Sequence, residues 1–456
     1  MRALTSGRLS LLQCAALCAL PFFLNGVASA AAPNAQQLAA YEQAPEIERV
    51  KLLLHLAKTG DVEAVETLLA VHPLEGPHAG NRILFIEGLL LKSQGKLTQA
   101  AEKFRAALAK DPSLTLVRSE LAQTLVELQE DDSAKHHLQL LAAEAPNEES
   151  ASGIRSFIDQ VDARKPYKFS GYVSLAPSTN LNSGSKHDTI YAPGIGQTFD
   201  INSSSKAKSG FGVAGGVNAG YTKRLGNDFS FVAGAGANAR LYDNKDFNSY
   251  SLSQTAEIRR LVEHGYFGLG AVSSQSLKKD KVGVSYASYG PRLSTSLQVT
   301  AQNHLSGSGT YEWRNYIDRK GVEGSALMFN AAWTHAFDAT LNTSIFGSYD
   351  VIKSDTEGAS YDSASAGLTV YKELTYGITT RLTGEVERSK FEDYDALSLA
   401  FRKDTRLTGT IELTKRDLNL LGFAPSLSYS YTENLSNIDL YDFNIHAVDF
   451  RLTKDF

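Results

Sequence analysis

The pattern of apolar and polar positions changes its period once along the chain, close to Tyr167. Before that position, apolar residues recur every three to four positions, which is typical of amphipathic helices. After it, apolar and polar residues alternate, which is typical of strands with one apolar face. Phe229, Phe231 and Leu241, for example, share one face of such a strand. The sequence therefore predicts a helical N-terminal part followed by a mainly β C-terminal part.

The alternating segments predict a transmembrane β-barrel, although a soluble sandwich would show the same alternation. The segments are about 10 residues long or longer, as membrane-spanning strands must be. Their polar faces carry charges such as Arg381 and Glu385, and aromatic residues such as Tyr311 and Trp313 gather towards strand ends. Aromatic residues are enriched where a barrel meets the membrane surface. We predict about 14 antiparallel strands over residues 167–456.

The predicted connections alternate in length, and the last strand ends on an aromatic residue. Short turns are expected at residues 226–228, 263–265 and 337–338, and longer polar loops at 182–205 and 353–358. Outer-membrane barrels have short periplasmic turns and longer outer loops. Phe450, Leu452 and Phe456 share the apolar face of the last strand. We expect these three residues to form the signal that the barrel-insertion machinery recognises.

The helical part repeats itself with a period of about 34 residues between 81 and 146, the tetratricopeptide period. Small, large and helix-ending residues recur at matching places in two successive repeats: Gly88, Ala100, Phe104, Ala107 and Pro112, then Ala122, Ala134, Leu138, Leu141 and Pro146. A generic helical bundle is the alternative. We predict a tetratricopeptide-like helical domain over 31–146 and a helical linker over 147–166. Such repeats present a concave face to partner proteins.

Residues 1–30 have the features of a secretion signal. Arg2 and Arg8 precede an apolar run over residues 9–24, and Ala28-Ser29-Ala30 offers the small residues that signal peptidase cleaves after. A membrane anchor is the rival interpretation, but Gln13 and Pro21 interrupt the run, which is short for a span. Cleavage after Ala30 would remove both cysteines of the chain and leave no disulfide.

Composition, charge and the search for motifs mainly exclude kinds of partner and kinds of site. The formal net charge is −5, so no nucleic-acid partner is implied. His136 and His137 are adjacent on a helix, which points their rings about 100° apart and away from a shared metal ion. Asp355 and Glu357 lack the ligand spacing of a calcium loop. The chain also lacks a nucleophile elbow and a phosphate loop. We therefore predict no catalytic residue, no metal, no cofactor and no enzyme activity.

Three stretches of the β part resemble the surface lipoprotein assembly modulators, the Slam proteins or type XI secretion translocons. They are Ser174 to Asn182, Phe401 to Asp404, and the closing hairpin from Pro425 to Phe443. The order of signal, repeats and barrel is also similar to that family. The positions that carry the resemblance are Pro177, Asn180, Asn182, Arg402, Asp404, Pro425, Ser436 and Asn437.

The resemblance implies translocation of a client, either a surface lipoprotein or a secreted protein, from periplasm to cell surface. It implies a barrel in the outer-membrane bilayer and a helical domain in the periplasm that captures the client. The side chains expected to touch the client are Arg82, Phe85, Leu89, Lys92, Gln123 and Glu127, although Phe85 and Leu89 are equally well placed to be buried between helices. Two alternatives remain: a passive porin with an accessory periplasmic domain, and an outer-membrane enzyme, which the missing catalytic residues disfavour.

Overall fold

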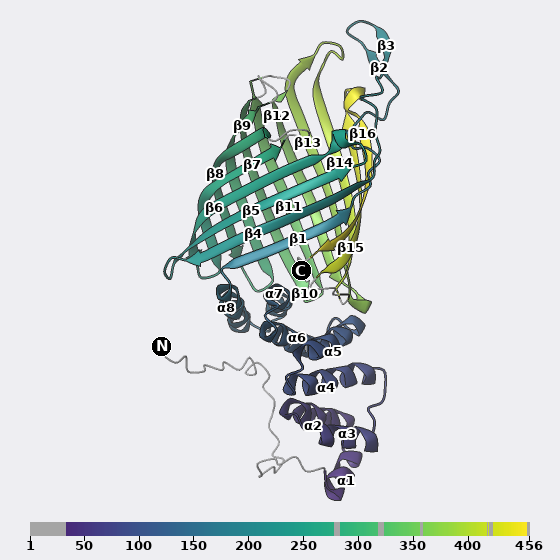
Figure 1. Cartoon of the computed structure of the whole chain (residues 1–456), viewed down its shortest axis with the longest axis vertical. Helices are drawn as coiled ribbons and strands as arrows, with labels where there is room; N and C mark the ends of the chain where they lie inside the picture. The colour runs from purple at the N-terminus through teal and green to yellow at the C-terminus, as the bar shows by residue number, and fades with distance from the viewer. Residues whose placement is uncertain are drawn as a thin grey trace.

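A computed structural model describes residues 33–277, 283–317, 323–355, 359–416, 418 and 423–453. A stack of helices lies against one end of a tall barrel, as Figure 1 shows. The predicted signal peptide, both cysteines, Glu357 and Phe456 lie outside the described residues. The change of period near Tyr167 is also the boundary between the last helix and the first strand.

The described residues before the barrel form eight α-helices, and local signals explain several of their ends. Asn34 caps the first helix with a capping box, and the side chains of Asp61 and Asn147 cap two others. Gly60 ends the second helix in the left-handed conformation that glycine adopts without strain. The helices are α1 Ala35–Gln43, α2 Glu46–Thr59, α3 Val62–Val71, α4 Ala79–Ser93, α5 Leu97–Lys110, α6 Thr115–Glu127, α7 Asp131–Ala143 and α8 Glu148–Arg164.

The helices pack as antiparallel hairpins around a continuous apolar core. Ala100, Phe104 and Leu121 are fully buried in it. The backbone of α4 passes so close to α5 that a Cβ on Gly88 would lie 2.4 Å from Phe104 Cε1. The positions predicted to be small or large therefore have those sizes because two helices cross there at short distance.

The C-terminal part is a closed barrel of 14 antiparallel strands, which confirms the predicted fold and excludes the sandwich. Neighbours in sequence are neighbours in the barrel, and β1 closes it against β16. The strands are β1 Tyr167–Leu175, β4 Gly212–Arg224, β5 Phe229–Tyr242, β6 Ser249–Val262, β7 Gly265–Leu277, β8 Val284–Gln298, β9 Asn303–Tyr316, β10 Gly324–Asp338, β11 Leu341–Ser354, β12 Tyr361–Glu373, β13 Ile378–Asp395, β14 Ala400–Lys415, β15 Ala424–Ser436 and β16 Phe443–Thr453.

The two faces of the barrel wall differ in polarity, as the alternation predicts. Large apolar side chains such as Leu269, Leu293 and Ile345 are more than half exposed on the outer face. The opposite face carries hydroxyl pairs, for example Thr408 with Thr432 at 3.4 Å between their Oγ1 atoms. An apolar outer band with a polar interior is what a bilayer demands of a barrel. Among the described residues, no helix has both the length and the apolar composition of a membrane span.

Most connections at the end that faces the helices have two to four residues, but residues 416–423 make a longer one between β14 and β15. Those at the far end have four residues or more. The turns after β4, β6 and β10 lie at the helical end, where short turns are predicted. The longest connection, residues 176–211, lies at the far end and contains a separate hairpin, β2 Thr189–Ala192 with β3 Gln197–Asp200. The expected short turns near 226–228, 263–265 and 337–338 are therefore confirmed, whereas the alternation of lengths does not hold between β14 and β15. Residues 356–358 of the expected loop lie outside the described residues.

Candidate functional site

The first helices of successive hairpins, α2, α4 and α6, are joined by a chain of ion pairs at their surface. Lys92 Nζ lies 3.0 Å from a Glu120 carboxylate oxygen, 3.4 Å from Gln123 Oε1 and 3.7 Å from Glu127. Lys58 Nζ approaches the other Glu120 oxygen at 3.1 Å. Burial raises the pKa of the Glu120 carboxyl, but Lys92 and Lys58 outweigh it and hold the pKa below its usual value. We call these five residues the ion-pair face.

The six side chains expected to touch a client divide into two groups. Lys92, Gln123 and Glu127 lie on the ion-pair face, whereas Arg82, in the first turn of α4, pairs with Glu46 of α2. Phe85 and Leu89 do not face solvent: their exposed fractions are 9% and 2%, and Phe85 packs against Phe104. Those two side chains fill the space between helices, so the expectation that they touch a client is corrected in favour of burial.

Leu116 is a surface residue that the sequence reasoning missed. Its side chain is 69% exposed, although other apolar side chains of α6, such as Leu121, are fully buried. Leu116 precedes Glu120, Gln123 and Glu127 by four, seven and eleven positions, so all four lie on the same side of α6. The same spacing in the sequence would have placed an apolar residue beside the ion-pair face.

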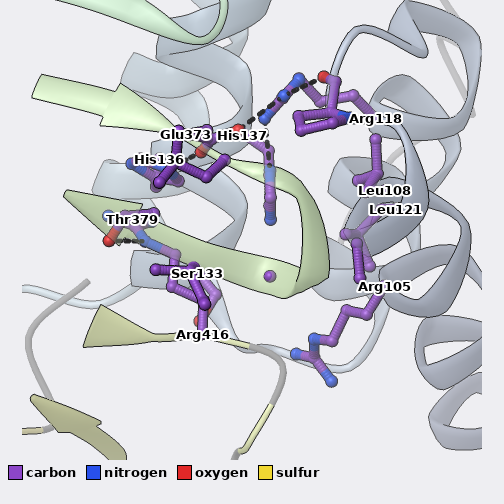
Figure 2. Close-up of a pocket in the computed structure, with 15 residues that line it drawn as sticks. Arg105, Leu108, Arg118, Leu121, Ser133, His136, His137, Glu373, Thr379 and Arg416 are labelled. Carbon is purple, nitrogen blue, oxygen red and sulfur yellow. Dashed lines mark hydrogen bonds and ion pairs between the residues drawn. The ribbon is translucent and has the colours of Figure 1, made fainter. Parts of the chain in front are cut away.

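The helical domain docks on the barrel through a buried ion pair (Figure 2). Arg118 Nη2, in α6, lies 2.8 Å from Glu373 Oε2, at the end of β12. The same carboxylate accepts from His136 Nε2 at 3.2 Å and from the Tyr371 hydroxyl at 3.2 Å. Arg118, His136 and Glu373 border a cavity of about 70 Å³ between the helices and the barrel turn. Arg118 is 1% exposed, so its charge is compensated by the barrel rather than by water.

The two adjacent histidines belong to this junction. Burial and the nearby Arg416 guanidinium lower the pKa of His136 to about 4, although Glu373 opposes the shift. Burial also lowers the pKa of His137, and the His136 ring adds to the effect. Both rings are therefore neutral at pH 7. Sequence reasoning tested this pair only as metal ligands and had no signal for a partner in the barrel.

Further contacts fix the helical domain to the start of the barrel. The Ala339 backbone N–H, in the turn before β11, donates to Glu144 Oε1 at 3.0 Å. Lys168, in β1, reaches back to Asp162 in α8 at 2.8 Å, and Lys135 of α7 binds the other oxygen of that carboxylate at 2.6 Å. The helix expected at 147–166 is thus present as α8, and it leads directly into β1.

The lumen wall is lined largely by small polar groups. A recess of about 480 Å³ extends over β7 to β13, with Arg292 and Glu385 among its lining side chains. Six serines also line it: Ser294, Ser296, Ser306, Ser308, Ser348 and Ser365. Among the described residues no group of three or more His, Cys, Asp or Glu side chains is arranged to hold a metal ion.

Most positions that carry the family resemblance gather at the far end of the barrel. Asn180 is 4% exposed and its Nδ2 donates to the Gly184 and Asn444 carbonyls at 2.9 and 3.1 Å. Asn182 Nδ2 donates to the Lys206 carbonyl at 2.8 Å. These asparagines thus shape the long loop after β1 and connect it to the strand that closes the barrel.

Arg402 and Asp404 form a second part of this far-end cluster. Arg402 Nε donates to both Asp404 oxygens at 3.1 and 3.0 Å, and its guanidinium lies over the rings of Phe391 and Tyr441. Asn437 accepts from the Lys403 backbone N–H at 2.7 Å, and Ser436 Oγ accepts from the Ile438 N–H. Pro425 departs from the cluster, since it lies near the helical end and pairs with Leu452.

The described part of the expected insertion signal lies on the outer face of the barrel. Phe450 is 48% exposed and lies opposite Leu175 of β1, while Leu452 lies opposite Val173. The alternation of these residues with Asp449 and Arg451 places them towards lipid. Recognition by the insertion machinery remains a prediction.

Two family models match the chain, and together they cover nearly all of the helices and the barrel. Residues 167–456 match the model described as surface lipoprotein assembly modifier. Residues 34–138 match the model described as surface lipoprotein assembly modifier, N-terminal TPR repeats. The predicted tetratricopeptide repeats are therefore confirmed over the generic bundle, and so is the predicted outer-membrane barrel.

Curated relatives carry related names. The chain is 23% identical over 414 residues to surface lipoprotein assembly modifier 1 of Haemophilus influenzae, covering 86% of this chain and 82% of that protein. It is 24% identical over 413 residues to the hemophilin secretion modulator of Acinetobacter baumannii, covering 82% and 78%. These names describe assembly and secretion, not a catalytic reaction.

Solved structures of outer-membrane channels are similar to part of this chain. The high-pH structure of Pseudomonas putida OprB aligns with 66% of this chain and 97% of its own, at 8% identity and a TM-score of 0.37. A likeness at this level carries no argument about function.

Proposed function

The chain belongs to the surface lipoprotein assembly modifier family, and we propose that it delivers a client protein from the periplasm to the cell surface. The client is a surface lipoprotein or a secreted protein. The helical domain lies in the periplasm and the barrel spans the outer membrane, after insertion by the barrel-assembly machinery.

The observation that carries this proposal is the docking of the repeat domain on the short-turn end of the barrel. Arg118, Glu144 and Lys168 make contacts across or beside that junction. A client bound to the helices is thereby held next to the lumen. Tethering of this kind raises the effective concentration of a bound partner to about the millimolar range.

We assign client contact to the ion-pair face and its surroundings, with Arg82, Lys92, Gln123 and Glu127 as the polar contacts. Leu116 offers an exposed apolar contact on the same side of α6. An exposed apolar residue among paired charges is a common composition for a protein-binding surface. Phe85 and Leu89 pack in the core between the helices and do not touch the client.

A passive porin with an accessory domain is the second candidate. The polar lumen suits small solutes as well as a polypeptide. Diffusion, however, gains nothing from a helical domain docked by a buried ion pair. The docking therefore favours a protein client.

The test is deletion of residues 34–146, which leaves α8 and the barrel. We expect the truncated barrel to reach the outer membrane, while at least one surface protein labelled in wild-type cells is lost from the surface. The measurement is surface biotinylation of intact cells followed by quantitative mass spectrometry, because it detects the loss of any surface protein, whatever the identity of the client. Solute uptake is measured in the same strains.

A matched variant separates client capture from docking. Lys92→Glu reverses one charge on the ion-pair face without touching the junction, so it should reduce the same surface proteins while the domain stays docked. If the truncated protein displays the full wild-type set and solute uptake still depends on the barrel, the porin replaces the translocator.

A further inference from the structure

Three basic side chains lie together on the outer face of the barrel, towards its far end. They are Arg388 and Lys390 of β13 and Lys403 of β14, and all three are exposed. They alternate with residues that face the lumen, and they share the outer face with Val386 and Leu407, which are 38% and 41% exposed. We call these three residues the basic patch.

Two of these like charges lie directly opposite each other in the sheet. Lys390 is in register with Lys403, and Arg388 lies two positions from Lys390 on the same face. Side chains opposite each other have Cβ atoms about 4.5–5.5 Å apart, and like charges in that arrangement are destabilising. Within the described part of the chain, no acidic side chain forms an ion pair with any of the three. The fold therefore holds two ammonium groups side by side without a carboxylate bound to either.

Two nearby carboxylates compensate the basic patch only in part. Asp362 of β12 lies opposite Lys390 in register, but at more than ion-pair distance. Glu392 is two positions beyond Lys390 and is already bound by Lys353 of β11. Together with Lys353, the basic patch therefore keeps an excess of positive charge over these two acids, and an anion from outside the chain would relieve the repulsion.

The basic patch lies where the apolar band of the wall ends. The outer face of β14 carries apolar residues between two lysines, in the order Lys415, Leu413, Ile411, Leu407 and Lys403. The separation of these lysines in the sequence is close to the length of about 9–11 residues that a tilted strand needs to cross the hydrocarbon core. Lys403 therefore lies at the level of the lipid head groups on the far side of the membrane.

The basic side chains are confined to one side of the barrel. Among the described strand residues of the far half, outward-facing lysine or arginine occurs on β11, β13 and β14, as Lys353, Arg388, Lys390 and Lys403. The corresponding outward positions of β4 to β10 that the structure describes are uncharged, for example Tyr289 of β8. Lysines that only mark the membrane surface would be expected around the whole rim, so this clustering indicates a local ligand.

An aromatic pair faces outward just beyond the basic patch. Tyr394 of β13 lies opposite Phe401 of β14, with their ring centres 5.3 Å apart, and the two side chains are 49% and 51% exposed. The turn between these strands is ordered by Asp395, whose Oδ1 accepts from the Leu397 and Ser398 N–H groups at 2.8 and 2.9 Å. The surface is thus preformed, and a ligand that covers all of it needs an anionic part at the membrane surface and a part with apolar faces further out.

We propose that the basic patch binds the phosphate groups of a phosphorylated glycolipid in the outer leaflet. Lysine and arginine near an anionic membrane surface strengthen binding, and arginine can donate two parallel hydrogen bonds to a phosphate. The acyl chains of such a lipid lie against Val386 and Leu407, and its outer sugar rings cover the aromatic pair. An anionic phospholipid has no sugar ring for that pair. The proposal rests on the proposed orientation of the barrel, with the far end outside the cell, and does not require a client.

The test is native mass spectrometry of the full-length protein in detergent micelles, titrated with diphosphoryl lipid A. We expect the wild-type protein to retain this lipid and to bind its dephosphorylated form and phosphatidylglycerol at least about tenfold more weakly. Equal retention of the dephosphorylated form would show that the acyl chains alone bind. Equal retention of phosphatidylglycerol would assign the surface to anionic lipids in general. Either result overturns the proposal, and neither measurement depends on a variant that might not fold.

Matched variants locate the site. Lys390→Gln/Lys403→Gln should weaken the retention of diphosphoryl lipid A about tenfold or more, because it removes both opposed charges. Lys390→Arg/Lys403→Arg keeps the charges and should retain the lipid. The control is Lys223→Gln/Arg260→Gln, which removes two positive charges from the outer face at the helical end of β4 and β6 and should leave retention unchanged. The heat-dependent gel shift verifies that each barrel is folded.

The outcomes for the lipid site and for client delivery are distinguishable. Wild-type retention by the Lys390→Gln/Lys403→Gln variant overturns the lipid site, and so does an equal loss in the control, which would show that net charge alone governs binding. Both results leave the proposed delivery of a client intact, because that proposal is tested by deletion of residues 34–146. Loss of lipid retention in the patch variant only, in a protein whose deletion changes no surface protein, keeps the lipid site and rejects client capture.

Discussion

Arg118 and Glu373 are 255 residues apart in the chain and form an ion pair of 2.8 Å across the junction between the helical domain and the barrel. Arg118 also donates to the Pro112 carbonyl at 2.6 Å, so it binds the loop before α6 as well as the barrel. Two charges buried at an interface stabilise it only while both are present, because either one alone lacks water and a partner.

Arg118→Met should release the helical domain from the barrel. Methionine fills much of the space of the arginine side chain but leaves the buried Glu373 carboxylate without the guanidinium that compensates its charge, at a cost of about 3–5 kcal/mol. We expect faster proteolysis between α8 and β1, with the barrel unchanged, as measured on protein in detergent. Lys103→Met is the control, because the Lys103–Glu87 pair lies at the surface, where such pairs contribute about 0–1 kcal/mol. Equal cleavage rates in both variants would contradict the assigned role.

Docking should weaken as the pH falls from about 6.5 to about 4. The pKa of His136 is about 4 in the junction and 6.5 in an exposed histidine. Between these two pH values, His136 therefore binds a proton in the released domain but not in the docked domain. Stability is therefore fully present above pH 6.5 and is lost on acidification, by about 3 kcal/mol once both states are protonated. The same proteolysis assay across pH checks this. His136→Gln should reduce the pH dependence in that window, and His136→Gln/His137→Gln should flatten it, because burial lowers the pKa of His137 as well. An unchanged profile in the double variant would assign the acid sensitivity to other groups.

Gly88→Ala should destabilise the helical domain although alanine favours helices. The added Cβ would lie 2.4 Å from Phe104, a fully buried ring with no free space to move into. Overpacking of this kind costs about 1–3 kcal/mol. The measurement is amide hydrogen exchange of α4 and α5 in the full-length protein. Gly153→Ala, in α8, meets nothing within 4 Å and should slow exchange slightly instead. Similar exchange in both variants would show that the close contact is not needed.

Arg402→Lys should loosen the far-end loop between β15 and β16 without unfolding the barrel. The guanidinium lies 3.6 Å from the centre of the Tyr441 ring and 4.1 Å from that of Phe391 while it holds Asp404. A lysine ammonium is not planar, so it cannot stack between two rings and at the same time donate two parallel hydrogen bonds to a carboxylate. We expect faster hydrogen exchange over residues 437–442, with the heat-dependent gel shift of the barrel retained. The control is Lys403→Arg on the outward-facing neighbour, and protection of the loop in both variants would argue against the stacking.

The sequence by itself determined the two domains, the closed barrel and its strand count. It also determined the places of the short turns near 226–228, 263–265 and 337–338 and the spacing of small and large residues from Gly88 to Leu141. Each of these is a local pattern: a period of two or of three to four positions, a turn, or a helix crossing repeated at fixed intervals. The resemblance of Asn180 and Arg402 to family positions was also visible, because it lies in short continuous stretches.

Only the tertiary structure decided which patterned residues meet. It buried Phe85 and Leu89, left Leu116 exposed, and brought Arg118 and His136 to Glu373. It also gathered Asn180, Asn444 and Arg402 at one end of the barrel. These relationships join residues more than 200 positions apart or depend on which side of a helix a neighbour covers. Periodicity fixes the face on which a side chain lies, whereas its partner is fixed by how the helical domain docks and how the barrel closes.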